Sequence, residues 1–406
     1  MAGPLSHIRV LDLSRILAGP WSAQILADLG AEVVKVERPG AGDDTRSWGP
    51  PFLKDEAGDD TTEAGYYLSV NRAKRSITVA LETPEGQQII RELAARSDIL
   101  IENYKYGTLA RFGLSYEDLK KINPRLIYCS VTGFGQTGPK REHPAYDFLI
   151  QGMGGLMSVT GERDGQPGGG PQKVGVPIID LMTGMYATVA VLAALAKRDV
   201  LGVGDQIDIA MLDVQVAALA NQAMNYLVSD KVPQRNGNAH PNIQPQDVYP
   251  CKDGDLILVV GNDSQFIKFC NVLGRPELPS DERFATNPAR VRNRVSMNEI
   301  IVAELAKQGR THWVDALEAV GVPCGPINNI AEVFEIPQVI EREMLRMVPH
   351  PLGGAVPQVA SPMRFTASPL EYTQAPPLLG QHSADILKEL GYGSDEIAAF
   401  QARKII

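Results

Sequence analysis

Strand and helix patterns alternate through the first 131 residues of the chain. Short apolar runs at 8–13, 32–36, 76–81, 98–101 and 125–131 have the length of buried strands, and segments with helical periodicity separate them. Strands that alternate with helices form a parallel sheet with helices on both faces, because each crossover returns the chain to the same end of the sheet. The pattern therefore predicts an α/β fold with a Rossmann-like sheet.

The pattern changes near residue 230. Residues 235–246 have no regular periodicity, and a hairpin pattern followed by helices comes next. Prolines then interrupt the chain until two C-terminal helical segments. We predict a large Rossmann-like domain at 1–225, a smaller α+β domain at 226–332, and a linker with C-terminal helices that return to the large domain at 333–406.

Length and composition place the chain among globular proteins. Its 406 residues are enough for two domains, and 44% hydrophobic with 21% charged residues is ordinary for a folded protein. The net charge of -9 argues against general nucleic-acid binding, which needs a basic surface to displace counterions from phosphates. The four cysteines are too far apart for a zinc ribbon or a disulfide framework, and we interpret them as buried or incidental thiols.

No segment of the sequence predicts a secreted or membrane protein. The N-terminus lacks a basic region followed by an apolar one, and the apolar run at 185–196 is about half as long as a membrane span. We interpret this run as a core helix and expect a cytoplasmic protein without a membrane partner.

Basic residues gather where the predicted strands begin or end. Arg38 follows the second strand, Lys74 and Arg75 precede the third, and Arg111 follows the fourth. If they converge, they form a polyphosphate pocket inside an acidic protein; the alternative is a set of solvated surface charges. The first turn, at 14–20, lacks the GxGxxG pattern, which argues against an NAD site but leaves another nucleotide-bearing ligand open.

Ordered sequence blocks run through essentially the whole chain. They include VLDL at 10–13, LGAEVVKVER at 29–38, NRAKRS at 71–76, GFGQTGP at 133–139 and VGVPIID at 174–180. In these blocks the sequence resembles the class III CoA-transferases, a CaiB/BaiF-like family, and is most similar to its dicarboxylate CoA-transferases that use succinyl-CoA. The resemblance implies an interlocked, ring-like homodimer.

The resemblance also implies the reaction, in which CoA moves from succinyl-CoA to a C4–C5 dicarboxylate. Acyl-CoA and small carboxylic acids are the implied ligands, coenzyme A is a substrate, and no metal, redox cofactor or nucleic acid is implied. The implied nucleophile is Asp180, since a carboxylate can attack an acyl-CoA carbonyl and form covalent aspartyl intermediates. Without the family, Asp180 is an acid in an apolar run that is either functional or a helix cap.

Further site residues follow from the resemblance block by block. Tyr146 and Asp147 are expected to position Asp180. The expected CoA contacts are Arg15, Ile16, Leu17, Ala18, Arg38, Lys74, Arg75, Asn103, Tyr104, Arg111 and Lys140. The expected clamp for the free distal carboxylate of the substrate consists of Arg46, Arg235, His240 and Gln244, with Arg364 less suited.

Two other functions stay open. The racemases of this family carry a histidine before an aspartate, where this chain has Tyr146 before Asp147, and tyrosine is a poor base near neutral pH. This difference weighs against an alpha-methylacyl-CoA racemase, although His143 could be either a base or a surface histidine. A CoA-binding protein without catalysis is the second alternative.

Overall fold

The computed structural model describes residues 3–406, which form two compact units. The first unit contains the residues up to Gly155, Val174–Ala223 and Pro337–Ile406. The second unit contains Leu156–Lys173 and Met224–Ile336. The first unit is therefore discontinuous in sequence, and the second interrupts it twice.

The second unit also includes a segment that the sequence predicted within the large domain, residues 156–173. The carbonyl oxygen of Gly161 accepts the N–H of Gly237 at 3.2 Å, and the guanidinium of Arg235 donates to the carbonyl oxygen of Ser158 at 3.2 Å. These contacts join residues far apart in sequence, so local patterns could not reveal them.

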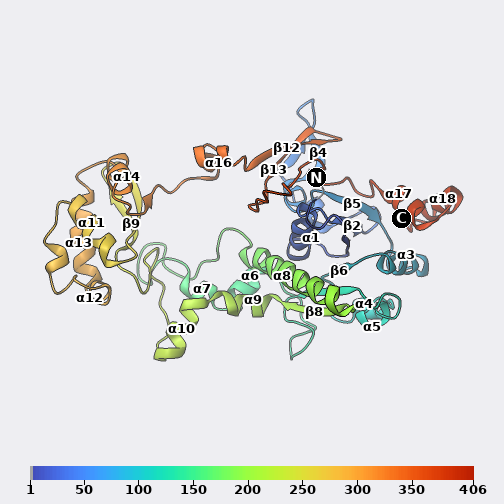
Figure 1. Cartoon of the computed structure of the whole chain (residues 1–406), viewed down its shortest axis with the longest axis horizontal. Helices are drawn as coiled ribbons and strands as arrows, with labels where there is room; N and C mark the ends of the chain where they lie inside the picture. Colours follow the sequence, from blue (N-terminus) through green and yellow to red (C-terminus); the bar gives the residue numbers. More distant parts are fainter. Residues whose placement is uncertain (1–2) are drawn as a thin grey trace. The chain divides into compact units, whose positions relative to one another are not determined.

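Six parallel strands form the central sheet of the first unit (Figure 1). Their order is β5 (Lys74–Thr78), β2 (Glu32–Glu37), β1 (Arg9–Asp12), β6 (Ile99–Glu102), β7 (Ile127–Thr132) and β8 (Asp205–Ala210). This order confirms the Rossmann-like parallel sheet that the alternating pattern predicted. Because the chain builds outward from β1 in both directions, the strand order reverses between β1 and β6.

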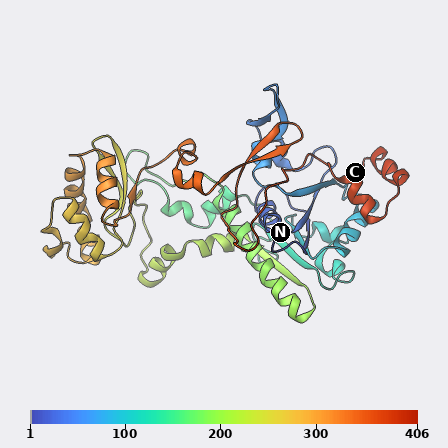
Figure 2. The ribbon, with the colours of Figure 1, turned by 45° about the horizontal axis from the view of Figure 1, so that its top comes forward.

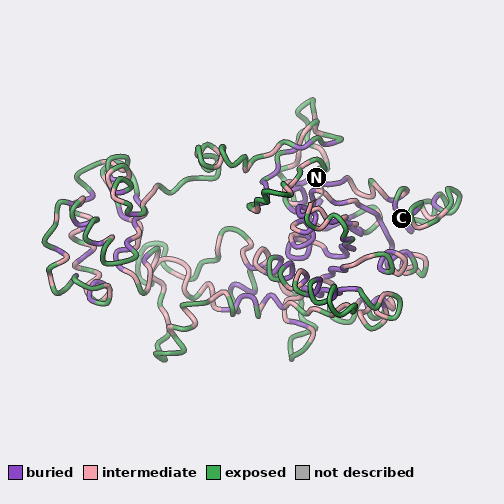
Figure 3. The backbone as a smooth tube through the Cα atoms, viewed as in Figure 1, coloured by how far each residue is buried: buried purple, intermediate pink, exposed green. Residues whose placement is uncertain are grey.

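Helices cover both faces of this sheet. In β1, Val10 packs with the helices of one face and Leu11 with those of the other. The helices of the first face are α1 (Ala18–Asp28) and α8 (Ile178–Leu201), and those of the second are α3 (Pro84–Ala95), α17 (Ser383–Leu390) and α18 (Ser394–Ala402) (Figures 1 and 2). Strands buried on both faces are apolar at consecutive positions, which is why these strands could be recognised as continuous runs (Figure 3).

Shorter elements complete the first unit. They are η1 (Asp44–Ser47), the β3–β4 hairpin (Phe52–Lys54 and Asp60–Ala64), α2 (Gly65–Leu68), α4 (Thr108–Arg111), α5 (Tyr116–Leu119), α6 (Asp147–Met153), α9 (Met211–Ala218), α16 (Pro337–Glu341) and the β12–β13 hairpin (Leu345–His350 and Gly354–Val359). The sequence predicted neither hairpin. β12 and β13 contain Pro349 and Pro357, which argue against a strand in a central sheet but are tolerated in a two-stranded hairpin.

The apolar pattern over 211–228 is typical of one helix, where the structure has two. α9 ends at Ala218, and α10 (Ala220–Ser229) begins at a residue with a positive φ of 42°. A positive φ interrupts the right-handed helix, so the apolar pattern continues although the helix does not.

A three-stranded antiparallel sheet and several helices form the second unit. The strands are β9 (Gln246–Cys251), β10 (Gly254–Val259) and β11 (Cys324–Gly325), and the first two form the predicted hairpin. The helices are α7 (Leu156–Val159), α11 (Asp263–Val272), η2 (Leu278–Ser280), α12 (Asn287–Arg292), α13 (Arg294–Leu305), α14 (Arg310–Glu318) and α15 (Ile330–Val333). Phe266, Phe269 and Trp313 belong to the separate core of this unit.

Helix α8 is long and apolar enough to cross a membrane by length and composition. Within its most apolar window of 18 residues, 44% of the residues are buried, including Ala187 and Val191, which pack on the sheet. Core helices of globular proteins pass the same test. The opposite side of α8 is exposed, notably at Met185 and Val189, so the predicted core helix is covered on only part of its surface.

Candidate active site

A cavity of about 150 Å³ lies at the carboxyl ends of β1, β6 and β7. The strand order reverses between β1 and β6, and the loops that leave such strands diverge and open a crevice. Three of the segments that line the cavity are 15–18 after β1, 103–106 after β6 and 131–133 at the end of β7. Asp180, in the first turn of α8, lines the same cavity. The fold therefore places this carboxylate where open α/β sheets bind ligands.

Asn103 joins the two loops across the strand reversal. Its side-chain oxygen accepts the N–H of Arg15 at 3.0 Å, and its side-chain nitrogen donates to the carbonyl oxygen of Arg15 at 2.7 Å. One amide side chain thus satisfies both backbone groups of a residue that has no sheet partner. The backbone of the first turn is fixed at the edge of the cavity.

Buried charges hold the first turn in an unusual conformation. Ile16 has a φ of 73°, which β-branched residues rarely adopt. Its N–H donates to both carboxylate oxygens of Asp43, each at 3.2 Å. The ammonium of Lys35 binds Asp43 at 2.9 Å and donates to the carbonyl oxygen of Ser14 at 2.9 Å, and the side chains of Lys35 and Asp43 are fully buried. The surrounding structure therefore determines a backbone geometry that Ile16 alone would not choose.

Asp147 determines how α8 begins. One of its carboxylate oxygens accepts the N–H of Ile179 at 2.7 Å and the N–H of Asp180 at 3.3 Å. Asp147 lies at the start of α6, so it caps α8 from another helix, while Pro177 at the N-cap position of α8 makes no side-chain cap. The capping role that the sequence left open for Asp180 thus belongs to Asp147.

The surroundings of Asp180 disfavour its ionised form. Burial, followed by the negative charge of Asp147, raises the pKa of Asp180 to about 7. An ordinary aspartate is almost fully ionised at neutral pH, whereas Asp180 is then poised between its two forms. A carboxyl group with such a shift inside a cavity is a candidate for chemistry.

Tyr66 is a neighbour of Asp180 that the sequence did not single out. Burial, together with the charges of Asp180, Asp147 and Asp43, raises the pKa of Tyr66 to about 12, so its hydroxyl stays protonated and can donate. The ring of Trp48 meets the ring of Tyr66 edge to face, with centroids 5.1 Å apart. Both residues lie in the excursion between β2 and β5, where no sequence pattern marked them.

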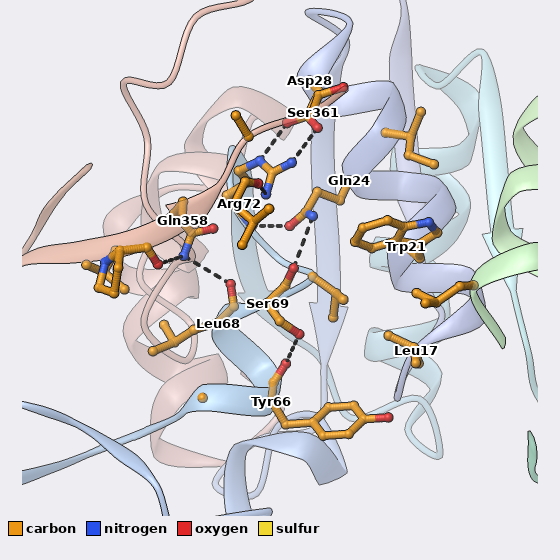
Figure 4. A pocket seen from close by; sticks show the side chains of 18 of the residues that line it. Leu17, Trp21, Gln24, Asp28, Tyr66, Leu68, Ser69, Arg72, Gln358 and Ser361 are labelled. Atoms are coloured by element: carbon orange, nitrogen blue, oxygen red, sulfur yellow. Dashed lines mark hydrogen bonds and ion pairs between the residues drawn. The ribbon is translucent and has the colours of Figure 1, made fainter. Parts of the chain in front are cut away.

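A second and much larger depression in the first unit is mostly apolar. Its volume is about 1290 Å³, and Trp21 of α1 and Tyr66 of α2 line it (Figure 4). Met185 and Val189 of α8 also line it. We call it the apolar groove. Two of its polar side chains, Arg72 and Asp28, are paired by the two hydrogen bonds that Figure 4 shows. The indole N–H of Trp21 is buried without a hydrogen-bond partner among residues 3–406.

Comparison with known proteins identifies the family. The family described as CoA-transferase family III matches residues 5–383. The chain belongs to this family. It is 50% identical over 387 residues to the succinate–glutarate CoA-transferase of Agrobacterium fabrum, covering 95% of this chain and 96% of that protein. It is 43% identical over 387 residues to the human succinyl-CoA:glutarate CoA-transferase, covering 95% of this chain and 86% of that protein.

A solved structure agrees with this assignment. The crystal structure of a CaiB/BaiF family protein from Brucella suis has a TM-score of 0.83 and 48% sequence identity, and the match covers 96% of this chain and 100% of that one. The resemblance found in the sequence is thus confirmed, and the chain is a CoA-transferase whose substrates are CoA thioesters. Residues 3–406 contain no cluster of three or more His, Cys, Asp or Glu side chains that could hold a metal ion.

The CoA-transferase cavity brings together part of the predicted site. The predicted residues that line it are Arg15, Ile16, Leu17, Ala18, Asn103, Tyr104, Tyr146 and Asp180. Asp147 lies behind Asp180 through the two hydrogen bonds described above. Lys105, Tyr106, Arg141 and His143 also line the cavity, and His143 is exposed there. Lys105, Tyr106 and Arg141 follow strand ends, so the rule that ligands bind beyond strand ends could have indicated them.

Three predicted ligand contacts are instead engaged inside the fold. The ammonium of Lys74 is fully buried and binds Asp12 at 2.9 Å, so it offers no charge to a phosphate. Arg75 pairs with Glu32 and Glu389. The guanidinium of Arg46 is buried and binds Glu37 at 2.8 Å and Glu63 at 3.1 Å, which leaves no free cation for a substrate carboxylate. These ion pairs count against the three residues as ligand contacts, and contact with CoA or substrate stays a prediction for each of them.

The remaining predicted CoA contacts lie outside the cavity lining. Arg38 is exposed and binds Asp44 at 3.0 Å, and the other oxygen of Asp44 binds Arg15 at 2.8 Å. Arg111 and Lys140 are exposed, and the ammonium of Lys140 lies over an aromatic ring. Contact of these cations with CoA stays a prediction.

Three of the predicted clamp residues are in the second unit: Arg235, His240 and Gln244. Arg235 pairs with Asp164, and His240 accepts the N–H of Asn242 through its ring nitrogen at 3.1 Å. Gln244 is fully buried and donates to Asn298 at 2.6 Å. Gln244 therefore lies in the core of its unit, and substrate contact by Arg235, His240 and Gln244 stays a prediction. Arg364 is exposed and donates to the carbonyl oxygen of Arg342.

The buried pair of Lys74 and Asp12 gives a stability prediction. Lys74→Met leaves a fully buried carboxylate without its nearest cation, which costs about 3–5 kcal/mol in comparable cases. We expect a lower free energy of unfolding in urea, followed by circular dichroism. Lys140→Met, at an exposed lysine, is the control and should unfold like the wild type. A stable Lys74→Met protein with a raised KM for acyl-CoA would restore the original assignment.

The raised pKa of Asp180 gives a pH prediction. Because the folded protein holds this proton up to a pH of about 7, the contribution of Asp180 to stability falls as the pH rises from about 4 to about 7. Asp180→Asn removes the cost of the buried charge, so its Tm should match the wild type near pH 4 and exceed it by about 2–4 °C at pH 8. Differential scanning fluorimetry across this range checks the crossover. A Tm difference independent of pH would contradict the shift.

Proposed function

We propose that this CoA-transferase moves CoA from succinyl-CoA to a C4–C5 dicarboxylate through covalent intermediates on Asp180. The observation that carries the proposal is the poised carboxyl group of Asp180 in the cavity at the strand reversal. The relatives named succinate–glutarate and succinyl-CoA:glutarate CoA-transferases support the choice of donor and acceptor.

The proposed reaction has four steps with no net proton change. Ionised Asp180 attacks the thioester carbonyl, the carbon–sulfur bond breaks, and a mixed anhydride and CoA thiolate form. The thiolate attacks the aspartyl carbonyl, which releases succinate and leaves an aspartyl-CoA thioester. The acceptor carboxylate then attacks this thioester and forms a second anhydride with release of thiolate. The thiolate attacks the acceptor carbonyl, which gives the product thioester and free Asp180.

The groups around the cavity suit these steps. A carboxylate with a raised pKa is a stronger nucleophile once ionised, and the shift of Asp180 provides this near neutral pH. Each tetrahedral intermediate carries an oxyanion that needs N–H or O–H donors. The first backbone N–H groups of α1 follow Leu17 and have no side-chain cap, and the Tyr66 hydroxyl is protonated, so both are candidate donors.

The distal carboxylate of the substrate needs a cation within the same cavity. Arg15 and Arg141 are guanidinium side chains that line it, and guanidinium groups bind carboxylates through paired N–H donors. Arg15 keeps its backbone fixed by Asn103 while its side chain is partly exposed and held by Asp44. We therefore assign the clamp to these two residues in place of Arg46.

A CoA-exchange assay tests the proposed function. Wild-type protein incubated with succinyl-CoA and glutarate, mesaconate or citramalate should form the matching acyl-CoA, detected by mass spectrometry. Asp180→Asn should lose at least about 10³-fold in kcat, because an amide cannot form the anhydride. Hydroxylamine should trap an aspartyl hydroxamate at Asp180 in the wild type only. Exchange at the wild-type rate in Asp180→Asn would overturn the proposal, and α-deuterium uptake without exchange would favour the racemase.

We also propose that the protein is a homodimer in which the partner covers the apolar groove. A volume of about 1290 Å³ exceeds the roughly 300–1,000 Å³ of small-molecule sites. Large exposed apolar patches mark contact sites between proteins, and Met185 and Val189 are 57% and 65% exposed at the groove. The unpaired indole N–H of Trp21 offers a donor in the same place.

Light scattering after size exclusion checks the dimer. The wild type should elute with twice the chain mass of 44.0 kDa. Val189→Asp puts a charge in the groove and should shift the population toward single chains by about 10-fold or more. Val200→Asp on the same helix is the control, since Val200 is 82% exposed and does not line the groove. A wild type of single-chain mass would refute the dimer.

A further inference from the structure

We propose that Gln151 is a positioning residue that locks Asp147 behind the nucleophile and so fixes the geometry and charge state in which Asp180 works. The sequence did not mark this glutamine. The inference deepens the proposed function, since it concerns the same carboxyl group, and its test includes a measurement that needs no substrate.

Gln151 lies one helical turn after Asp147 in α6 and is completely buried. Its side-chain nitrogen donates to the carboxylate oxygen of Asp147 that does not face α8. Its side-chain oxygen accepts the N–H of Val174 at 2.9 Å. One buried amide therefore connects α6 with the segment that leads into α8.

The other carboxylate oxygen of Asp147 holds the first turn of α8 through the N–H groups of Ile179 and Asp180. With Gln151 on the second oxygen, both ends of the carboxylate are held and the group cannot rotate. The same glutamine anchors Val174, four residues before Ile178, where α8 begins. Gln151 thus constrains the nucleophile from two sides, through Asp147 and through the approach of the chain to α8.

Asp147 and Asp180 are neighbouring carboxyl groups, and their closeness is the reason that the hydrogen bonds of Gln151 matter. When two acids interact closely, a proton can be shared, and neither keeps a fixed role. Asp147 accepts hydrogen bonds on both carboxylate oxygens, from Gln151 and from the first turn of α8, whereas the carboxyl group of Asp180 lines the cavity. The mechanism requires this difference, because only Asp180 lines the cavity.

The other charged or titratable groups near the two acids do not distinguish Asp180 from Asp147. Tyr66 of α2 is kept protonated by its raised pKa, and Asp213 of α9, which packs against α6, is exposed. Arg15, Lys105, Arg141 and His143 line the cavity and are absent from the causes of the Asp180 shift, which are burial and Asp147. The amide of Gln151 is the side-chain donor on Asp147.

Kinetics of two Gln151 variants test the role. Gln151→Leu keeps the volume but removes both hydrogen bonds, and we expect kcat to fall about 10–100-fold while the KM for succinyl-CoA changes less than about 3-fold. Gln151→Glu keeps the shape and adds a negative charge, so the acidic limb of the kcat–pH profile should move up by about one pH unit or more. Wild-type kcat in Gln151→Leu, or an unmoved limb in Gln151→Glu, would overturn the proposal.

Gln215→Leu is the matched control for a general loss of packing. Gln215 is also a completely buried glutamine and lies on α9, which packs against α6, and its side-chain amide has no hydrogen-bond partner among residues 3–406. We expect this variant to keep the wild-type pH profile even if its Tm falls. An equal change of pH profile in both variants would mean that Gln151 acts only through packing, and the proposal would fail.

A thermodynamic cycle without substrate separates this inference from the proposed function. The change of Tm caused by Gln151→Leu is measured at pH 8 in the wild type and in Asp180→Asn. If Gln151 acts on the carboxyl pair, the two changes should differ by at least about 2 °C, because the second background lacks the charge of Asp180. Equal changes would contradict the role of Gln151. A wild type that transfers no CoA would instead refute the proposed function while leaving this coupling measurable.

Discussion

The cavity of this CoA-transferase depends on charges that are buried around the turn after β1. Lys35 with Asp43 and Lys74 with Asp12 are paired at 2.9 Å, with all four side chains fully buried. Burying ions costs free energy, and such pairs are often no more stabilising than apolar residues of similar size. Here they hold the turn after β1, including the strained Ile16, in the position that lines the cavity. We interpret them as elements of site geometry and not as a source of stability.

At the nucleophile, too, the fold holds a particular geometry at a cost in stability. Asp180 lies in the first turn of α8, a position where helices favour a negative charge, yet burial and Asp147 raise its pKa to about 7. The fold therefore keeps two carboxyl groups together at a cost in free energy. Asp147 is satisfied by hydrogen bonds from α8 and α6, while Asp180 is left with access to the cavity. The difference in hydrogen bonding gives the two acids separate roles.

The two units differ in what they contribute to the candidate site. The first unit contains the sheet, the cavity and the apolar groove, and all the cavity residues belong to it. In the second unit, Arg235 and Gln244 are engaged by Asp164 and Asn298. Their chemical types suggested a substrate clamp, but a cation or an amide binds a ligand only when the fold leaves its donors free. Arg15 and Arg141 line the cavity, which is why we propose them for the clamp.

The sequence by itself determined the parallel α/β architecture, the family and the candidate nucleophile, because apolar periodicity is local and the family blocks are contiguous. It also marked Arg15 and Asn103, which follow strand ends directly. Only the tertiary structure decided which charged residues are free. Lys74, Arg75 and Arg46 match a phosphate or carboxylate site by type and spacing, but each meets carboxylates that lie elsewhere in the chain. Ion pairing and capping join residues distant in sequence, so the position of Arg15 at the cavity, the hydrogen bonds by which Asp147 holds α8 and the proposed role of Gln151 are properties of the fold.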